Sequence, residues 1–513
     1  MTTATAPARP APTSRRRVPT PPSMLRLWRI ELRRSPMPLI LPLIALLFWF
    51  DSYRPSTSQA LVYPLVTFWN MGQGHTIIDF GPFVAGMAAW IGSRDGRRGT
   101  ADLLTATPRP RWVAQLATWA ATATWAVLAY LVFIGVMFAV YAHRGVLGEP
   151  PWWWVAVGAI AVVTFSAGGF TVGVLFPSRF AAPLAAFGGF LALMLSSQTG
   201  FRDTSGWALI LPTNSNGNFQ PDSGLLYPYL PDLPIARMMF FAGIAVVALG
   251  LAGLPVAAGG GRLRVVAAAV TAVGLAATGT AVGLVSTARL GPHGIVIAAL
   301  HDAASDKLTV YIPVCTGAGF RVCVNPTYKR YLTDTAAALA PVTHEVAGLP
   351  GTPVRAVQVP AVYNNSDGQG GQAMTIAGDP PVLSVPLGAY NFLPGPTGFS
   401  SISITPVGVF DQSVRALFIQ AYVDAGSGPG TPAQQAVQAA LLQGAGVPFA
   451  AQPGLLSGLG PMGPMGPRPG QATGRVYAAG RRLAALPAGT RHAWLAAHLA
   501  ALRAGHLTLE QLP

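Results

Sequence analysis

The chain has 513 residues, of which 51% are hydrophobic and only 10% are charged. Soluble proteins carry about 25% charged residues, so this composition argues against an ordinary soluble enzyme and predicts a membrane protein. The formal net charge of +15 does not predict nucleic-acid binding, because most arginines stand beside apolar blocks and no basic face or binding motif accompanies them.

The first predicted elements precede the membrane. Residues 1–22 are rich in Pro, Ala, Thr and Arg and show no apolar periodicity, which predicts a disordered cytoplasmic N-terminus. Residues 23–36 place apolar side chains at helical spacing among arginines. This pattern predicts an amphipathic helix that lies at the interface and contacts membrane lipids; the alternative is a plain positively charged flank of the first span. The expected membrane-interface residues are Trp28, Arg33 and Arg34.

Residues 37–287 form the expected transmembrane domain, a polytopic α-helical bundle of about seven helices. A membrane span needs roughly 20 mostly apolar residues. Seven stretches are counted as spans, the first and the fifth being the weakest: 37–53, 76–92, 113–141, 152–176, 181–195, 235–258 and 265–286. At the start of the fourth, Trp152, Trp153 and Trp154 predict an aromatic belt at the membrane interface.

Three residues inside the spans are singled out. Gly169 and Gly173 have the spacing that lets two helices approach closely. Asp79 could contact a transported molecule or gate a pathway, but an interfacial residue at the start of the second span is the favoured interpretation.

The arginines predict the orientation of the chain, because cytoplasmic connections carry an excess of Lys and Arg. Most arginines of this half precede the first span or lie between the second and third, the fourth and fifth, and the sixth and seventh spans. This distribution predicts a multi-pass protein of the cell (plasma) membrane with a cytoplasmic N-terminus. With seven spans, everything after residue 286 is extracytoplasmic; if the fifth span fails, the tail faces the cytoplasm.

The connection after the second span carries the most informative motif. It reads GSRDGRRGTADLLTATPRPRWVAQLATW over residues 92–119. It resembles the first cytoplasmic loop of ABC-2 type transporter permeases, the membrane-spanning subunits of ABC transporters, in which a charged stretch precedes Gly-Thr, Leu-Leu and a Pro-containing turn with Arg. The matching residues are Arg97, Arg98, Gly99, Thr100, Leu103, Leu104, Pro108 and Arg109.

The resemblance implies that this loop forms a short coupling helix that docks on a cytoplasmic ABC ATPase subunit. The residues suit that role, because Thr100 can cap a helix and Leu103 with Leu104 would offer an apolar contact. A polar hairpin that only follows the charge rule is the alternative. The chain contains no phosphate-binding G-x-x-x-x-G-K-[ST] loop, so ATP would bind in the partner and no cofactor is expected here.

The resemblance also implies an exporter subunit that pairs as a homodimer or as a heterodimer with another permease. The chain departs from that family in its expected seven spans and its large tail, because such permeases commonly have six spans and both ends inside. The main alternative is a non-transporting polytopic membrane protein whose spans anchor an extracytoplasmic binding or sensor domain.

The tail is expected to begin with an extracytoplasmic mixed α/β domain at 288–456. Within it, IPVCTGAGFRVCV predicts a β-hairpin that sets Cys315 opposite Cys323. A disulfide between them is expected in an oxidising compartment, and two reduced thiols are the alternative. A metal site is not expected, since no second Cys/His pair stands at ligand spacing. A Pro/Gly linker at 457–472 and amphipathic C-terminal helices at 473–513 follow.

No catalytic residues are predicted in the tail, since neither H-E-x-x-H nor G-x-S-x-G occurs. A binding or interaction role is therefore preferred to an enzymatic one. One polar set could form a site, although ordinary surface positions explain it better: His301, Asp302, Tyr311, Tyr328, Lys329, Arg330 and Tyr331.

Overall fold

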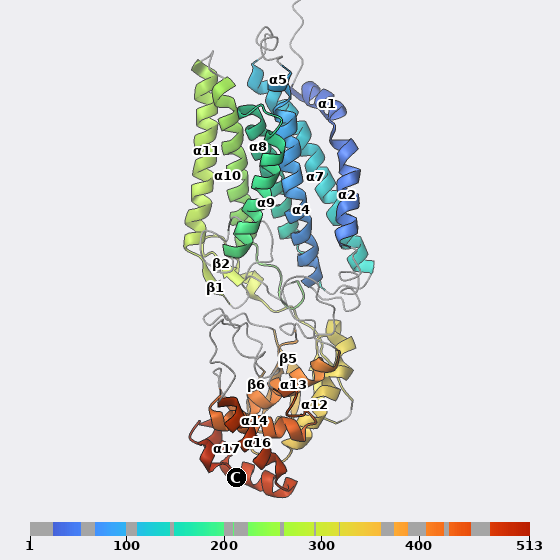
Figure 1. The fold of residues 1–513 in the computed structure, drawn as a ribbon, viewed down its shortest axis with the longest axis vertical. Helices are drawn as coiled ribbons and strands as arrows, with labels where there is room; N and C mark the ends of the chain where they lie inside the picture. The colour runs from blue at the N-terminus through green and yellow to red at the C-terminus, as the bar shows by residue number, and fades with distance from the viewer. Residues whose placement is uncertain are drawn as a thin grey trace, which may run out of the picture.

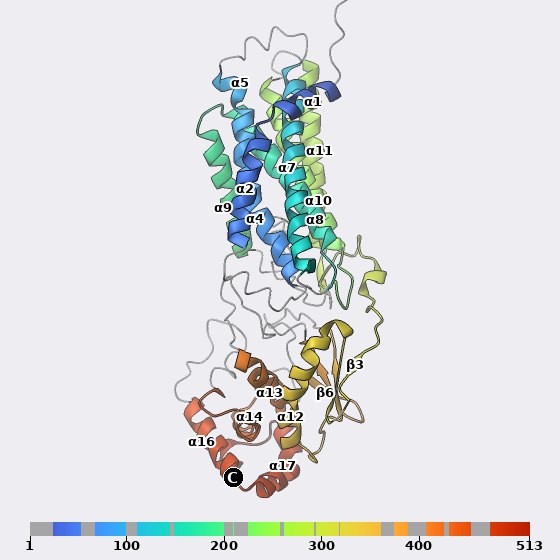
Figure 2. The ribbon, with the colours of Figure 1, turned by 90° about the vertical axis from the view of Figure 1, so that its right-hand side faces the viewer.

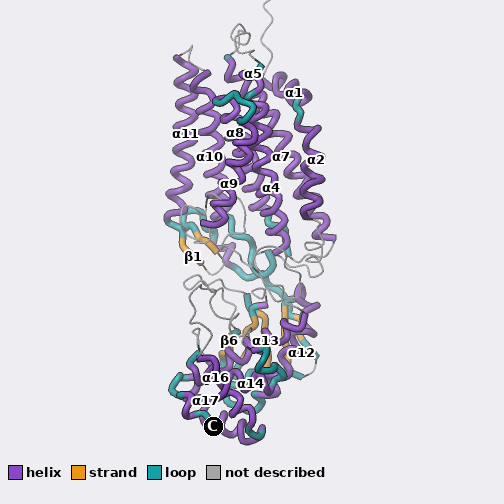
Figure 3. The backbone as a smooth tube through the Cα atoms, viewed as in Figure 1, coloured by secondary structure: helices purple, strands orange, loops and turns teal. Residues whose placement is uncertain are grey.

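The computed structural model divides the chain into a helix bundle and a folded tail at one end of that bundle (Figure 1). In the part of the chain that the structure describes, strands occur at the junction and in the tail (Figure 3). The structure describes residues 24–52, 67–98, 110–143, 148–199, 209, 224–256, 261–291, 294–317, 319–360, 374–387, 407–424, 430–452 and 472–513.

Each predicted span coincides with a helix of the bundle. These helices are α2 (Met37–Ser52), α4 (Thr67–Gly92), α7 (Arg111–His143), α8 (Trp152–Leu175), α9 (Ala181–Thr199), α10 (Asp232–Val256) and α11 (Gly261–Ser286). The largest difference is α4, which begins at Thr67 rather than near residue 76. Polar residues such as Asn70 and Gln73 interrupt the apolar run there without ending the helix.

Four helices of the described chain are long and apolar enough to cross a membrane: α7, α8, α10 and α11. Shorter apolar helical stretches lie at Ile77–Gly92 and Ala181–Leu195. Large apolar side chains stand exposed on the outside of the bundle, such as Leu184 at 65% and Val273 at 65%, where lipid would cover them. These features define a helical membrane protein, and the count of seven spans stays a prediction.

Small residues bring α4 and α8 into close contact. A Cβ added at Gly169 would overlap the carbonyl oxygen of Ala85, and one at Gly173 would overlap that of Ala89. The predicted close approach at these two glycines is therefore confirmed. On another face of α8, Thr164 donates a hydrogen bond to the carbonyl oxygen of Phe241 on α10 at 2.7 Å. Interhelical hydrogen bonds of this kind favour association where lipid offers no partner.

Arginine-rich segments gather at the end of the bundle away from the tail. Two short helices mark that end in Figures 1 and 2, α1 (Met24–Arg34) and α5 (Arg94–Arg97). Because the bundle helices alternate in direction, α7 and α11 also begin there, which brings Arg111, Arg262 and Arg264 to the same end. The side of the membrane that this end faces follows from the charge rule and stays a prediction.

The tail contains a five-stranded mixed sheet in the order β3-β4-β5-β7-β6. Its central pairs β4/β5 and β5/β7 are parallel, while β3 and β6 pair antiparallel at the two edges. The strands are β3 (Val314–Cys315), β4 (Arg321–Val324), β5 (Arg355–Gln358), β6 (Thr375–Ala377) and β7 (Val382–Val385). This is the mixed α/β domain that the sequence predicts.

Helices pack on the sheet and share its hydrophobic core. They are the 3-10 helix η3 (Pro326–Tyr331), α12 (Leu332–Glu345), α13 (Val407–Asp424), α14 (Pro432–Gly444), α16 (Ala472–Ala485) and α17 (Ala488–Arg503). Buried residues of the last two, including Leu483 and Leu499, belong to the same core as Val322 and Leu383 of the sheet. The C-terminal helices, expected as a separate segment, are thus part of the domain. The predicted Pro/Gly linker lies almost wholly outside the described residues.

A two-stranded ribbon connects the bundle to the tail. Strands β1 (Arg289–Gly291) and β2 (Gly294–Val296) pair antiparallel directly after α11. The buried residues Ile295 and Ile297 belong to the core of the bundle, and the 3-10 helix η2 (Ala303–Asp306) follows. Further along, the amide of Thr309 donates to the carbonyl oxygen of Leu226 at 2.8 Å. The start of the tail is therefore attached to the end of the bundle.

Candidate functional site

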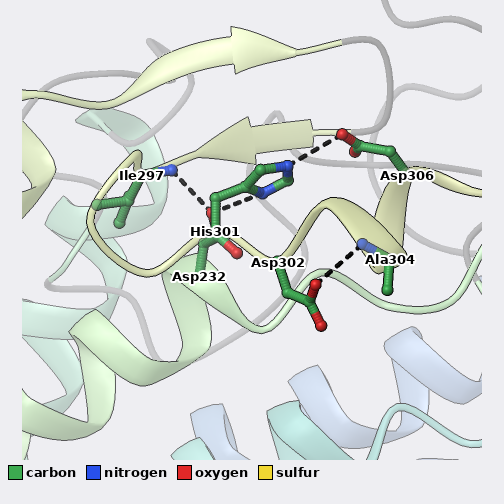
Figure 4. A network of polar contacts seen from close by, with 6 residues as sticks. All are labelled: Asp232, Ile297, His301, Asp302, Ala304 and Asp306. Carbon is green, nitrogen blue, oxygen red and sulfur yellow. Dashed lines mark hydrogen bonds and ion pairs between the residues drawn. The ribbon is translucent and has the colours of Figure 1, made fainter.

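A histidine and two aspartates meet where the tail joins the bundle (Figure 4). Asp232 is the first residue of α10, and its carboxylate is completely buried. Its Oδ2 atom accepts the backbone N–H of Ile297 at 2.8 Å and lies 3.1 Å from Nδ1 of His301. The other ring nitrogen of His301, Nε2, lies 3.0 Å from Oδ2 of Asp306. The imidazole thus bridges a bundle helix and η2.

Local structure fixes each member of this cluster. Asp302 caps η2, because its Oδ1 accepts the N–H of Ala304 at 3.0 Å, and this turn sets Asp306 beside the ring of His301 (Figure 4). The apolar residues before the turn, Ile295 and Ile297, pack into the bundle and bring the segment against α10. Burial in the core and a helix cap therefore position the histidine from two sides.

Both carboxylates act on the protonation of the ring. The hydrogen bond with Asp306 is the largest influence and raises the pKa of His301 above its ordinary value, while burial lowers it and the negative charge of Asp232 raises it. The side chain of His301 is 16% exposed and that of Asp306 is 44% exposed. The carboxylate of Asp306 is therefore accessible to solvent, whereas that of Asp232 is not.

The predicted polar set is only partly brought together. His301 and Asp302 lie at the junction, whereas Tyr328 and Tyr331 are buried in the core of the tail, where their ring centroids are 6.0 Å apart. Lys329 is exposed on η3. Among the described residues, no group of three or more His, Cys, Asp or Glu side chains is arranged to hold a metal ion.

Asp232 and Asp306 are not among the residues predicted from the sequence. One signal could have pointed to Asp232, since an acidic residue beside Pro at the start of an apolar run marks a helix N-terminus, where a negative charge is favourable. Its partner His301 lies 69 residues further on, so the sequence gives no reason to pair them.

The arginine-rich end of the bundle contains the start of the predicted coupling loop. Arg97 stacks on the ring of Trp90, with its Cζ 3.8 Å from the ring centroid, and its Nη2 donates to the carbonyl oxygen of Trp90 at 3.0 Å. Arg98 is exposed at the end of α5. The remaining predicted residues lie outside the described part of the chain: Gly99, Thr100, Leu103, Leu104, Pro108 and Arg109.

Helix α1 forms as expected, and its tryptophan is half-buried beside α7. Trp28 donates from Nε1 to the hydroxyl of Thr124 on α7 at 3.3 Å, and Trp125 of α7 donates to the carbonyl oxygen of Leu32 at 2.9 Å. The face of α1 that contains Trp28 therefore packs on α7. Arg33 and Arg34 are exposed, as an interfacial role requires.

Two predictions need correction. Trp152 and Trp153 are 63% and 40% exposed, but Trp154 is buried and has Cζ of Arg237 4.8 Å from its ring centroid. Successive helical residues point about 100° apart, so three in a row do not all face outward. Asp79 is not a helix-start residue, because α4 begins at Thr67 and Asp79 lies well inside it.

The predicted disulfide is present in the tail. Cys315 on β3 and Cys323 on β4 are directly opposite in the antiparallel register, and their sulfur atoms are bonded. The interpretation of two reduced thiols is therefore wrong for this structure.

Similarity to known proteins does not assign a function to these features. Comparisons with known protein families, with curated proteins and with solved structures find no match. The function has to be argued from the two ends of the bundle.

Proposed function

We propose that this chain is the membrane-spanning subunit of an ABC-2-like exporter, driven by a separate cytoplasmic ATPase that docks on the connection between α4 and α7. The motif that resembles the ABC-2 permeases begins at Arg97, where α5 ends. This connection extends from the arginine-rich end of a bundle whose helices can cross a membrane. Helix α1 is a second element at the same end of the bundle (Figure 2).

The observation that carries the proposal is the link between α1 and the base of this connection. Arg94 of α5 lies 3.7 Å from the carboxylate of Glu31 on α1, and α1 is itself fixed to α7 through Trp28. A Cβ at Gly96 of α5 would overlap Pro177 in the turn between α8 and α9. A push on the loop would therefore reach α1, α7 and α8 together, which is what transmission from an ATPase requires.

In this proposal the arginine-rich end is cytoplasmic, the tail is extracytoplasmic, and two copies or two related subunits form the transport path. The apolar bundle suits lipid-like, peptide or drug-like cargo better than small ions, because charged residues that could line an ion path are scarce in the spans. In the alternative function the protein does not transport, and the bundle only anchors the tail. Co-purification of a partner ATPase separates the two functions.

The test is co-purification of the tagged full-length chain from its own cells, followed by an ATPase assay and mass spectrometry of bound proteins. We expect an ATPase with a phosphate-binding loop to be retained, and Leu103→Asp combined with Leu104→Asp to release it. Ala106→Asp is the matched control, because it adds a charge to the same loop outside the Leu-Leu pair. An ATPase that stays bound to the double variant contradicts the docking site, and failure to retain any ATPase favours the anchor.

A further inference from the structure

With Asp232 and Asp306 both ionised, the two contacts of His301 call for two protons on its ring. Nδ1 faces Oδ2 of Asp232 at 3.1 Å and Nε2 faces Oδ2 of Asp306 at 3.0 Å. A carboxylate only accepts hydrogen bonds, and a neutral imidazole has a single N–H to donate. Both contacts are hydrogen bonds only when the ring is an imidazolium. Loss of one proton leaves a ring nitrogen lone pair facing a carboxylate oxygen.

The two contacts have unequal surroundings. Asp232 is completely buried, and its Oδ2 also accepts the N–H of Ile297 at 2.8 Å. Loss of the N–H at Nδ1 would set a ring lone pair against a buried carboxylate that cannot turn to water, so the remaining proton stays on Nδ1. Asp306 is 44% exposed and can turn to water. Deprotonation therefore breaks the contact with Asp306 and keeps the contact with Asp232.

We propose that His301 is a pH-dependent latch that holds η2 against the bundle while the ring is protonated and releases η2 when the ring loses its second proton. The latch joins α10 to the segment that leads into the tail, so it controls how tightly the extracytoplasmic domain is held at the end of the bundle. It does not depend on the coupling loop, and it would operate equally in a protein that only anchors the tail.

Both acidic and basic groups lie on the elements around the ring. On η2 and its flanks these are Asp302, Asp306 and Lys307; on α10 they are Asp232 and Arg237; and β1 contributes Arg289. The carboxylate of Asp302 is engaged as the cap of η2, and Arg237 lies over the ring of Trp154 at 4.8 Å. Among these groups, only the carboxylates of Asp232 and Asp306 contact the ring.

The direction of the pH effect follows from the raised pKa of His301. A group with a raised pKa in the folded state contributes stability that is complete below its ordinary pKa of about 6.5 and is lost as the pH rises through the folded value. The latch is therefore closed in mildly acidic surroundings and opens as they become alkaline.

The experiment is hydrogen exchange of the full-length protein in lipid nanodiscs at about pH 5.5 and about pH 8.5, corrected for the intrinsic pH dependence of exchange. Peptides that cover residues 298–309 should lose about tenfold in protection at the higher pH, while peptides from α8 in the bundle stay unchanged. His301→Gln should show weak protection of this segment at both pH values.

Asp306→Asn is the decisive variant. Its side-chain amide can accept a hydrogen bond from the imidazolium or donate one to the neutral ring, so η2 should stay protected at both pH values. A purely structural role of Asp306 predicts weaker protection at both. The matched control is His492→Gln, because Nε2 of His492 contacts only the carbonyl oxygen of Ala347, at 2.7 Å, and one proton satisfies it. The latch is wrong if wild-type protection does not depend on pH, or if Asp306→Asn loosens the segment.

Discussion

Gly169 of α8 lies so close to the carbonyl oxygen of Ala85 on α4 that a Cβ at position 169 would overlap it. Gly169→Ala therefore forces the two helices apart, and overpacking of this kind costs about 1–3 kcal/mol. We expect a lower melting temperature for the full-length variant in nanodiscs, measured by tryptophan fluorescence.

The neighbouring glycine provides the control. A Cβ at Gly168 meets nothing within 4 Å, and alanine is favoured over glycine in a helix by about 1 kcal/mol. Gly168→Ala should leave the melting temperature unchanged or raise it. Equal destabilisation by the two substitutions would contradict the close contact between α4 and α8.

The disulfide allows the proposed orientation to be tested. A thiol reagent that does not cross membranes should label Cys315 on intact cells only after reduction, because the cysteine is bonded to Cys323 and the tail is proposed to be outside. Ser178→Cys in a background without other cysteines is the control, since this exposed residue lies in the turn at the arginine-rich end. It should label only after permeabilisation. The reverse pattern for the two sites would overturn the orientation.

Local pattern predicted the elements of this fold well. Apolar runs marked each helix of the bundle, and the spacing of Cys315 and Cys323 marked the β3/β4 hairpin, because such features depend on residues close together in the chain. Local pattern does not predict which face of a helix packs against the protein and which faces lipid. Trp154 was expected at the membrane interface, but it is buried beside Arg237, since a neighbouring helix competes with lipid for the same apolar surface.

The junction shows what the sequence leaves open. His301 was recognised as a candidate, but a histidine acquires its chemistry from its contacts, and those come from Asp232 at the start of α10 and from Asp306 on η2. Only packing of the ribbon residues Ile295 and Ile297 into the bundle brings α10 to the ring. A similar limit holds for α16 and α17, whose amphipathic pattern did not reveal that they complete the core of the tail.

An ion pair fixes α17 to α12 in that core. Nη2 of Arg491 lies 2.6 Å from Oε1 of Glu345, and the two side chains are only 12% and 15% exposed. Glu345→Ala leaves a mostly buried arginine without its partner and should cost about 3–5 kcal/mol. The measurement is urea unfolding of the full-length protein, monitored by hydrogen exchange in peptides from the tail.

The pair of Arg475 and Glu510 is the matched comparison. These side chains are 77% and 70% exposed and lie 3.2 Å apart, so Glu510→Ala should leave the stability of the tail nearly unchanged, because water and salt screen exposed ion pairs. If Glu345→Ala proves as mild as Glu510→Ala, the attachment of α17 to the domain does not depend on the buried pair.

A buried carboxyl at the end of α13 makes the stability of the tail depend on pH. Burial raises the pKa of Asp424 from 3.8 to about 6, against the opposite effect of the hydrogen bond from Gln438, whose Nε2 donates to Oδ1 at 2.6 Å. The folded tail thus keeps a proton that the unfolded chain releases. The stability that this proton provides is complete below about pH 3.8 and is lost as the pH rises through about 6.

Asp424→Asn should remove this dependence, because an amide oxygen still accepts from Gln438 and no charge forms at higher pH. We expect the variant to unfold at a higher urea concentration than the wild type at about pH 8, and the difference to shrink towards about pH 4. Asp411→Asn is the control, since Asp411 is 46% exposed and pairs with Arg415 at 3.9 Å on the same helix. It should keep the wild-type pH profile between about pH 4 and about pH 8. The prediction fails if the unfolding midpoint of the wild-type tail does not change over this range. Asp424 would then be ionised in the folded state, because water reaches its carboxylate.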